Sequence, residues 1–124
     1  MSTILMAIKP EYVEKIFSKE KRYEYRKRLC KEKIDKIIVY SSSPVKRVVG
    51  ELIIKNILYD KKDIIWNKTN KYGSISKEKF DKYYDNCDKV VAYEIGQVIK
   101  YEKPKSLNDY HIKVAPQSYV YISE

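Results

Sequence analysis

Residues 19–26 read Lys-Glu-Lys-Arg-Tyr-Glu-Tyr-Arg, and this stretch decides both the expected fold and the expected site. Its two tyrosines alternate with charged residues, which is the period-two pattern of a β-strand with one apolar and one polar face. Glu24 and Arg26 share the polar face, so they can form an ion pair. Lys21 stands at the start of the strand, where we expect it to stay mobile and to reach an anion such as phosphate. The alternative is a solvated strand edge, because exposed ion pairs are common and stabilise little.

The residues before this stretch predict a strand followed by a helix. Thr3 to Ile8 is a short apolar run typical of a buried strand, and Pro10 ends it because proline lacks a backbone donor. Proline also suits the first position of a helix, and apolar residues then recur at helical spacing to about Ser18. The chain therefore begins strand, helix, strand, with the charged stretch on the second strand.

Beyond residue 33 the pattern predicts four more strands and two short helices. The strands are expected over Ile34–Tyr40, Val45–Leu58, Val90–Tyr101 and Tyr119–Ile122, and the helices over Asp63–Thr69 and Ser76–Tyr84. Gly50 interrupts the longest strand, and we expect a bend or bulge there that lets the sheet curl. This order indicates an α+β domain with mostly antiparallel strands and about three short helices. Closure into a small β-barrel would remove its exposed edges.

The length and charge of the chain bound its organisation and its partners. A chain of 124 residues fits one domain, so residues 1–124 are expected to share one core. The formal net charge of +9 would concentrate a polyanion near the surface, which makes nucleic acid the first partner to consider. The alternative is that the charge is only a soluble, lysine-rich surface.

Residues that hold metals or cofactors are few. His111 is the only histidine, the only cysteines are Cys30 and Cys87, and the three glycines are isolated. We therefore expect no metal site, no glycine-rich phosphate loop and no bound cofactor. The apolar run at residues 4–8 is too short for a membrane span or a signal peptide. A cytoplasmic protein without a membrane partner is expected, and a monomer is favoured.

A family resemblance rests on the charged stretch and on several others. ASCH domains carry glycine, any residue, lysine, two residues, glutamate, any residue and arginine after a first strand and helix. Lys21, Glu24 and Arg26 match this pattern in order and spacing, with Lys19 in place of the glycine. Further stretches resemble a branch of uncharacterised ASCH proteins, namely residues 6–10, 40–46, 48–51, 72–76 and 116–118. The resemblance implies a PUA-like β-barrel with a cleft where the motif strand meets the first helix.

The same resemblance implies a role in RNA binding or RNA processing and a set of site residues. On that model the residues that converge on the cleft are Lys9, Lys21, Glu24, Arg26, Ser42, Ser43, Lys46 and Gln117. The leading hypothesis is an RNA- or nucleotide-binding domain that uses this basic cleft. Its partner would be single-stranded or structured RNA, or a nucleotide.

The alternative is a small hydrolase in which Lys21 and Glu24 are catalytic. One ASCH branch resembles an amidohydrolase of acylated cytidine that uses a lysine, a threonine and a distant glutamate. Lys21 matches that lysine, but Glu24 stands at the threonine position, and no counterpart of the glutamate aligns around residues 72–77. Another branch cuts single-stranded RNA, which needs a base near the 2′-hydroxyl and a cation for the transition state. A third hypothesis is a structural or regulatory domain whose charge serves only solubility.

Overall fold

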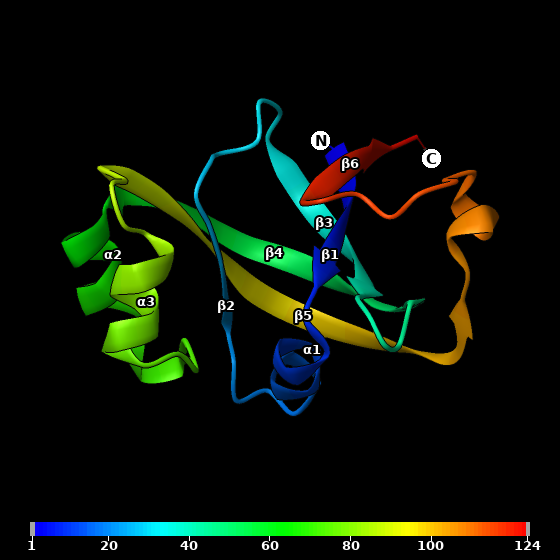
Figure 1. The fold of residues 1–124 in the computed structure, drawn as a ribbon, viewed down its shortest axis with the longest axis horizontal. Coiled ribbons are helices and arrows are strands. Elements are labelled where there is room, and N and C mark those ends of the chain that lie inside the picture. Colours follow the sequence, from blue (N-terminus) through cyan, green and yellow to red (C-terminus); the bar gives the residue numbers. More distant parts are fainter. Residues whose placement is uncertain (1, 124) are drawn as a thin grey trace.

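The fold is built on one six-stranded sheet, which crosses the centre of the molecule in Figure 1. The structure is a computed structural model, in which residues 2–123 are described. The strands are β1 (Ser2–Ile8), β2 (Tyr23–Arg26), β3 (Ile34–Ser41), β4 (Arg47–Lys61), β5 (Lys89–Lys105) and β6 (Tyr119–Ile122). The helices are α1 (Pro10–Phe17), α2 (Lys62–Thr69) and α3 (Lys77–Tyr83), with single 3-10 turns η1 (Asn70–Tyr72) and η2 (Leu107–Tyr110). None of the helices within this range is long and apolar enough to cross a membrane.

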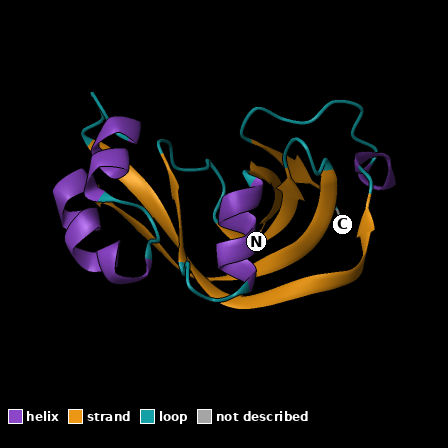
Figure 2. Ribbon diagram, turned by 60° about the horizontal axis from the view of Figure 1, so that its bottom comes forward, coloured by secondary structure: helices purple, strands orange, loops and turns teal. Residues whose placement is uncertain are grey.

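The strand order in the sheet is β2-β5-β4-β3-β1-β6. Only β1 and β3 run parallel, and the other four neighbouring pairs are antiparallel. The predicted α+β class, with mostly antiparallel strands and three short α-helices, is confirmed. The sheet curls strongly, as in a barrel (Figure 2), but its strand order is open, with β2 and β6 at the two ends.

The strands β4 and β5 form one long hairpin that carries α2 and α3 at its far end. Their pairing extends from Val48 opposite Lys105 to Lys61 opposite Lys89. Both strands are longer than predicted, because residues outside the predicted ranges, such as Lys61 and Lys89, pair with each other although lysine is depleted in strands in general. The connection between them places both helices at one end of the molecule (Figure 1).

Gly50 marks a bulge in β4, as predicted. The register of β4 against β5 shifts between Val48 and Gly50, and its register against β3 shifts at the same place. A Cβ atom at position 50 would collide with the Ile99 carbonyl oxygen and lie 2.8 Å from Cζ of Phe17. Glycine therefore lets β4 bend while α1 packs closely on the sheet.

Two apolar clusters fix the positions of α1, α2, α3 and β2 relative to one another. The larger one packs α1 against β1, β3, β4 and β5, with Ile16 and Leu52 fully buried. The second lies under α2 and α3, where the ring of Tyr25 on β2 meets Phe80 of α3 edge-on at 5.4 Å between centroids. Phe80 in turn packs edge-on against Tyr84 at 4.8 Å. These aromatic contacts hold α3 beside β2.

Candidate functional site

Arg26 and Glu24 form the predicted ion pair on the polar face of β2. The Nε and Nη2 atoms of Arg26 both donate to Oε2 of Glu24, at 3.0 and 2.7 Å. Nη2 also donates to the Ala7 carbonyl oxygen at 2.9 Å, and Nη1 lies 3.5 Å from Oγ of Ser118. Glu24 is only 5% exposed. The guanidinium group is therefore held in one orientation, and it ties β2 to β1 and to the segment before β6.

Lys21 is not mobile, and this corrects the prediction. Its side chain is 3% exposed, and Nζ donates to the Gly73 carbonyl oxygen at 2.7 Å. The ammonium group also lies over the rings of Tyr12 and Tyr25, at 5.2 and 4.7 Å from their centroids. The residue that covers it, Gly73, is 52 positions away, so the local pattern of charges could not reveal the contact.

Burial changes the acidity of Lys21. Loss of hydration lowers the pKa of its ammonium group from 10.5 to about 8, although the nearby Glu24 carboxylate opposes the change. At neutral pH the group is still mostly protonated. A lysine whose pKa lies close to neutrality can either stabilise negative charge or take part in proton transfer.

A cleft of about 690 Å³ opens where β2, the start of α1, the β3–β4 turn, α3 and the segment before β6 meet. It is lined by every residue of the predicted site, namely Lys9, Lys21, Glu24, Arg26, Ser42, Ser43, Lys46 and Gln117. Ser42, Ser43 and Lys46 come from the β3–β4 turn, and Gln117 comes from the segment before β6. The structure thus brings the predicted residues together, and their role in binding stays a prediction.

Residues 1–123 match the family described as a domain of unknown function, DUF365. An ASCH domain-containing ribonuclease from Zymomonas mobilis is 23% identical over 90 residues, which span 72% of this chain and 61% of that protein. The crystal structure of ASCH from Zymomonas mobilis superposes with a TM-score of 0.89, at 20% identity, over 99% of this chain and 89% of that one. The chain is an ASCH-domain protein of the DUF365 family. The predicted family is confirmed.

This ASCH domain also resembles part of a longer protein. The large ribosomal subunit protein uL22 of Ureaplasma parvum is 31% identical over 121 residues. That match covers 97% of this chain but only 39% of the relative, so the ASCH chain spans about two fifths of the length of the curated protein.

The cleft of this ASCH domain contains residues that the sequence analysis did not assign to it. Lys79, Lys82 and Tyr83 of α3 line it, together with Tyr12 of α1. The spacing of the three α3 residues places them on one helix face, while Phe80 and Tyr84 are buried. That spacing was readable in the sequence, but nothing in it showed that α3 packs beside β2.

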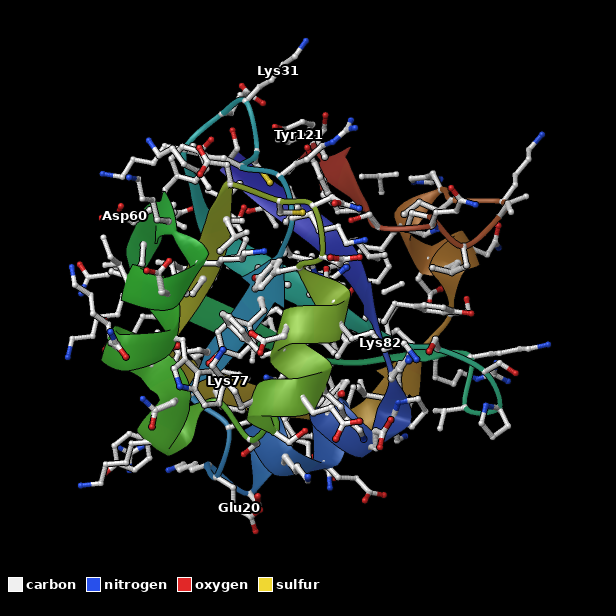
Figure 3. The ribbon with its side chains drawn as sticks, turned by 60° about the vertical axis from the view of Figure 1, so that its left-hand side comes forward. Glu20, Lys31, Asp60, Lys77, Lys82 and Tyr121 are labelled. Atoms are coloured by element: carbon white, nitrogen blue, oxygen red, sulfur yellow. The ribbon has the colours of Figure 1, made fainter. Side chains whose placement is uncertain are left out.

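Lys77 and Lys82, near the two ends of α3, lie on different sides of the helix (Figure 3). Lys77 pairs with Asp81 at 2.6 Å and lies 5.6 Å from the ring centroid of Trp66, on the α2 side. Lys82 lines the cleft instead. Only part of the lysine-rich surface of α3 therefore belongs to the site.

Positive charge dominates the cleft. Six basic side chains and only two carboxylates line it, and one carboxylate, Glu24, is already paired with Arg26. Among the basic side chains, Lys9, Lys46, Lys79 and Lys82 are exposed, whereas Lys21 is buried. Such an arrangement attracts anionic ligands and strengthens their contacts inside the cleft.

Groups of three or more histidine, cysteine, aspartate or glutamate side chains arranged to hold a metal are absent from residues 2–123. The expected absence of a metal or cofactor stays a prediction.

Proposed function

We propose that this ASCH domain binds single-stranded RNA in the basic cleft between β2, α3 and the segment before β6. The observation that carries the proposal is that four exposed lysines line the same cleft as the fixed Arg26–Glu24 pair. Phosphate contacts from lysine and arginine supply most of the affinity of nucleic-acid-binding proteins. The net charge of +9 and the name of the Zymomonas mobilis relative, a ribonuclease, support RNA as the ligand.

Aromatic side chains favour a single strand over a duplex. Tyr83 lies in the cleft wall with 37% of its surface exposed, and Tyr12 is partly buried beside Lys21. Bases of a single strand can turn out of their stack and pack on such rings, whereas the bases of a duplex are held in place by pairing and stacking. The cleft volume of about 690 Å³ lies within the range of roughly 300–1,000 Å³ in which proteins bury small organic groups.

The test compares two double variants that remove the same formal charge. In K79A/K82A both lysines come from the cleft wall, whereas in K68A/K103A both are exposed and neither lines the cleft. Affinity for a labelled single-stranded RNA is measured by fluorescence anisotropy over a range of salt. If each cleft lysine contacts a phosphate, K79A/K82A makes the log-log salt slope shallower by about 1.4, at about 0.7 per contact. Equal losses of affinity in both variants would mean that only overall charge matters.

RNA cleavage is a second candidate function, and the environment of Lys21 favours it. Although burial lowers its pKa to about 8, Lys21 stays mostly cationic at neutral pH, so that it can stabilise the charge of a phosphodiester transition state, with Glu24 nearby as a base. Lys21→Met removes the ammonium group but keeps a side chain of similar length at this position. If the domain is a ribonuclease that uses Lys21, this variant should lose RNA cleavage while its melting temperature stays close to that of the wild type. Equal cleavage by the variant and the wild type would remove Lys21 from the mechanism.

Hydrolysis of acylated cytidine has less support. Thr3 and Thr69 are the only threonines of the chain, and neither lines the cleft. Thr69 is buried and bonded to the Tyr25 hydroxyl at 2.8 Å and to the Ile65 carbonyl oxygen at 2.7 Å. Aliphatic hydroxyl groups in the cleft come from Ser42 and Ser43 instead. Incubation with acylated cytidine is expected to give no cytidine, and product formation dependent on Lys21 would contradict this.

A further inference from the structure

A second hollow continues the cleft beyond Arg26. It has a volume of about 430 Å³ and shares Arg26, Tyr83 and Gln117 with the first. Lys27 and Arg28, which follow β2, line it with positive charge, and both are exposed. The proposed binding of RNA in the first cleft uses neither of them. The second hollow therefore offers a separate surface for a ligand that passes Arg26.

Arg26 lies at the junction of the two hollows, and part of its guanidinium group is available there. Nε and Nη2 are occupied by Glu24 and the Ala7 carbonyl oxygen. Within residues 2–123, Nη1 makes only the long 3.5 Å contact with Ser118. The Arg26 side chain is 17% exposed. An anion located between the hollows can thus accept a hydrogen bond from Nη1 without breaking the ion pair.

Tyr83 forms a wall common to both hollows. Its ring packs against the buried ring of Tyr84 at 4.8 Å between centroids, which limits its movement. Nζ of Lys27 lies 5.1 Å from the Tyr83 centroid. Tyr119, partly buried, forms another aromatic surface in the second hollow. A groove lined by both aromatic and cationic side chains suits the bases and phosphates of a single strand.

We propose that the two hollows hold consecutive nucleotides of one RNA strand and that Arg26 binds the phosphate that joins them. The ligand is then an oligonucleotide, and a free nucleoside or mononucleotide would fill only half of the site. This inference rests on the proposed RNA binding and names its ligand class.

The experiment compares ligands of different length and variants of equal charge. The ligands are uridine 5′-monophosphate and a labelled uridine pentanucleotide. The variant K27A/R28A changes the second hollow, and K31A/K33A is the matched control, because both of its lysines are exposed in the same connection and line neither hollow. K27A/R28A is expected to weaken pentanucleotide binding about tenfold and to make its salt slope shallower by about 1.4. Its affinity for the mononucleotide should match that of the wild type, and K31A/K33A should change neither ligand.

Cross-linking gives a second readout that does not depend on affinity. A pentanucleotide with a photoreactive uridine should label peptides that contain Lys27, Arg28 or Tyr119, and the photoreactive mononucleotide should not. Equal weakening of pentanucleotide binding by K27A/R28A and K31A/K33A, or no weakening by either, would overturn the inference, as would the absence of these cross-links. Failure of the wild type to bind either ligand would instead refute the proposed RNA binding itself.

Discussion

Replacing Lys21 with methionine should remove a rise in stability that the wild-type protein shows between pH 7 and pH 9.5. Burial lowers the pKa of Lys21 from 10.5 to about 8 in the folded protein. In the window between these values the unfolded chain binds more protons than the folded one, so the free energy of unfolding increases with pH. Methionine cannot titrate and fills a similar volume.

The magnitude follows from the size of the shift. A change of about 2.5 pKa units corresponds to about 3 kcal/mol of unfolding free energy at low pH, at about 1.4 kcal/mol per unit. As Lys21 loses its proton in the folded protein between pH 7 and pH 9.5, the free energy of unfolding should rise by about 2 kcal/mol. The window ends there because the pKa of Tyr25 is raised, to about 12, mainly by burial. Tyrosines with a raised pKa make the free energy of unfolding fall as pH rises above about 10. This effect is the same in the wild type and in the variant.

The assay is urea denaturation at several pH values, followed by the fluorescence of Trp66. Loss of the hydrogen bond to Gly73 should cost Lys21→Met about 1 kcal/mol at every pH, which leaves the slope unaffected. The difference between the two proteins should therefore shrink or change sign as pH rises. Parallel pH profiles for the wild type and the variant would contradict the lowered pKa of Lys21, and would mean that the contacts with the Tyr12 and Tyr25 rings compensate for burial.

Three further substitutions test the surroundings of Lys21. Gly73→Ala should lower the free energy of unfolding by about 1–3 kcal/mol, because the new Cβ would collide with the Tyr25 hydroxyl, and an unchanged urea midpoint would contradict this. Tyr25→Phe should cost about 1 kcal/mol in the same assay, since it removes the hydrogen bond to Thr69, and full stability would show that this bond contributes nothing. Glu24→Gln should lower the pKa of Lys21 further, because the carboxylate is the group that raises it. NMR of the Lys21 side chain measures that pKa, and a rise would reverse the assigned effect.

Most of the fold could be predicted from local patterns. The alternation in residues 23–26 and the proline at position 10 predicted β2 and α1, and the predicted bulge at Gly50 is present. The 3-10 turn over Leu107–Tyr110 was missed, because a capping box within a short polar segment gives no periodic signal. The ends of β4 and β5 were missed because their pairing is stabilised by the partner strand and not by intrinsic preference.

The site was predictable in composition but not in its contacts. Ser42 and Gln117 could be assigned only through the family resemblance, because they are distant in sequence and share no pattern with Glu24. Lys21 is buried against Gly73, to which it donates a hydrogen bond. The side of the cleft that α3 forms depends on the packing of Phe80 against Tyr25. Such contacts between distant segments arise from tertiary packing, which single-sequence patterns do not encode.

RNA binding in the cleft is tested most directly by an NMR titration of the labelled protein with single-stranded RNA, in which each backbone amide reports its own environment. If RNA binds in the cleft, the largest chemical-shift changes should fall on the amides of Ser42, Ser43, Gln117 and Lys82, while those of Asn56 and Gly96, which line neither hollow, should stay unchanged. Chemical-shift changes spread evenly over the basic surface, or centred on the β4–β5 hairpin, would contradict the claim that the cleft is the RNA-binding site.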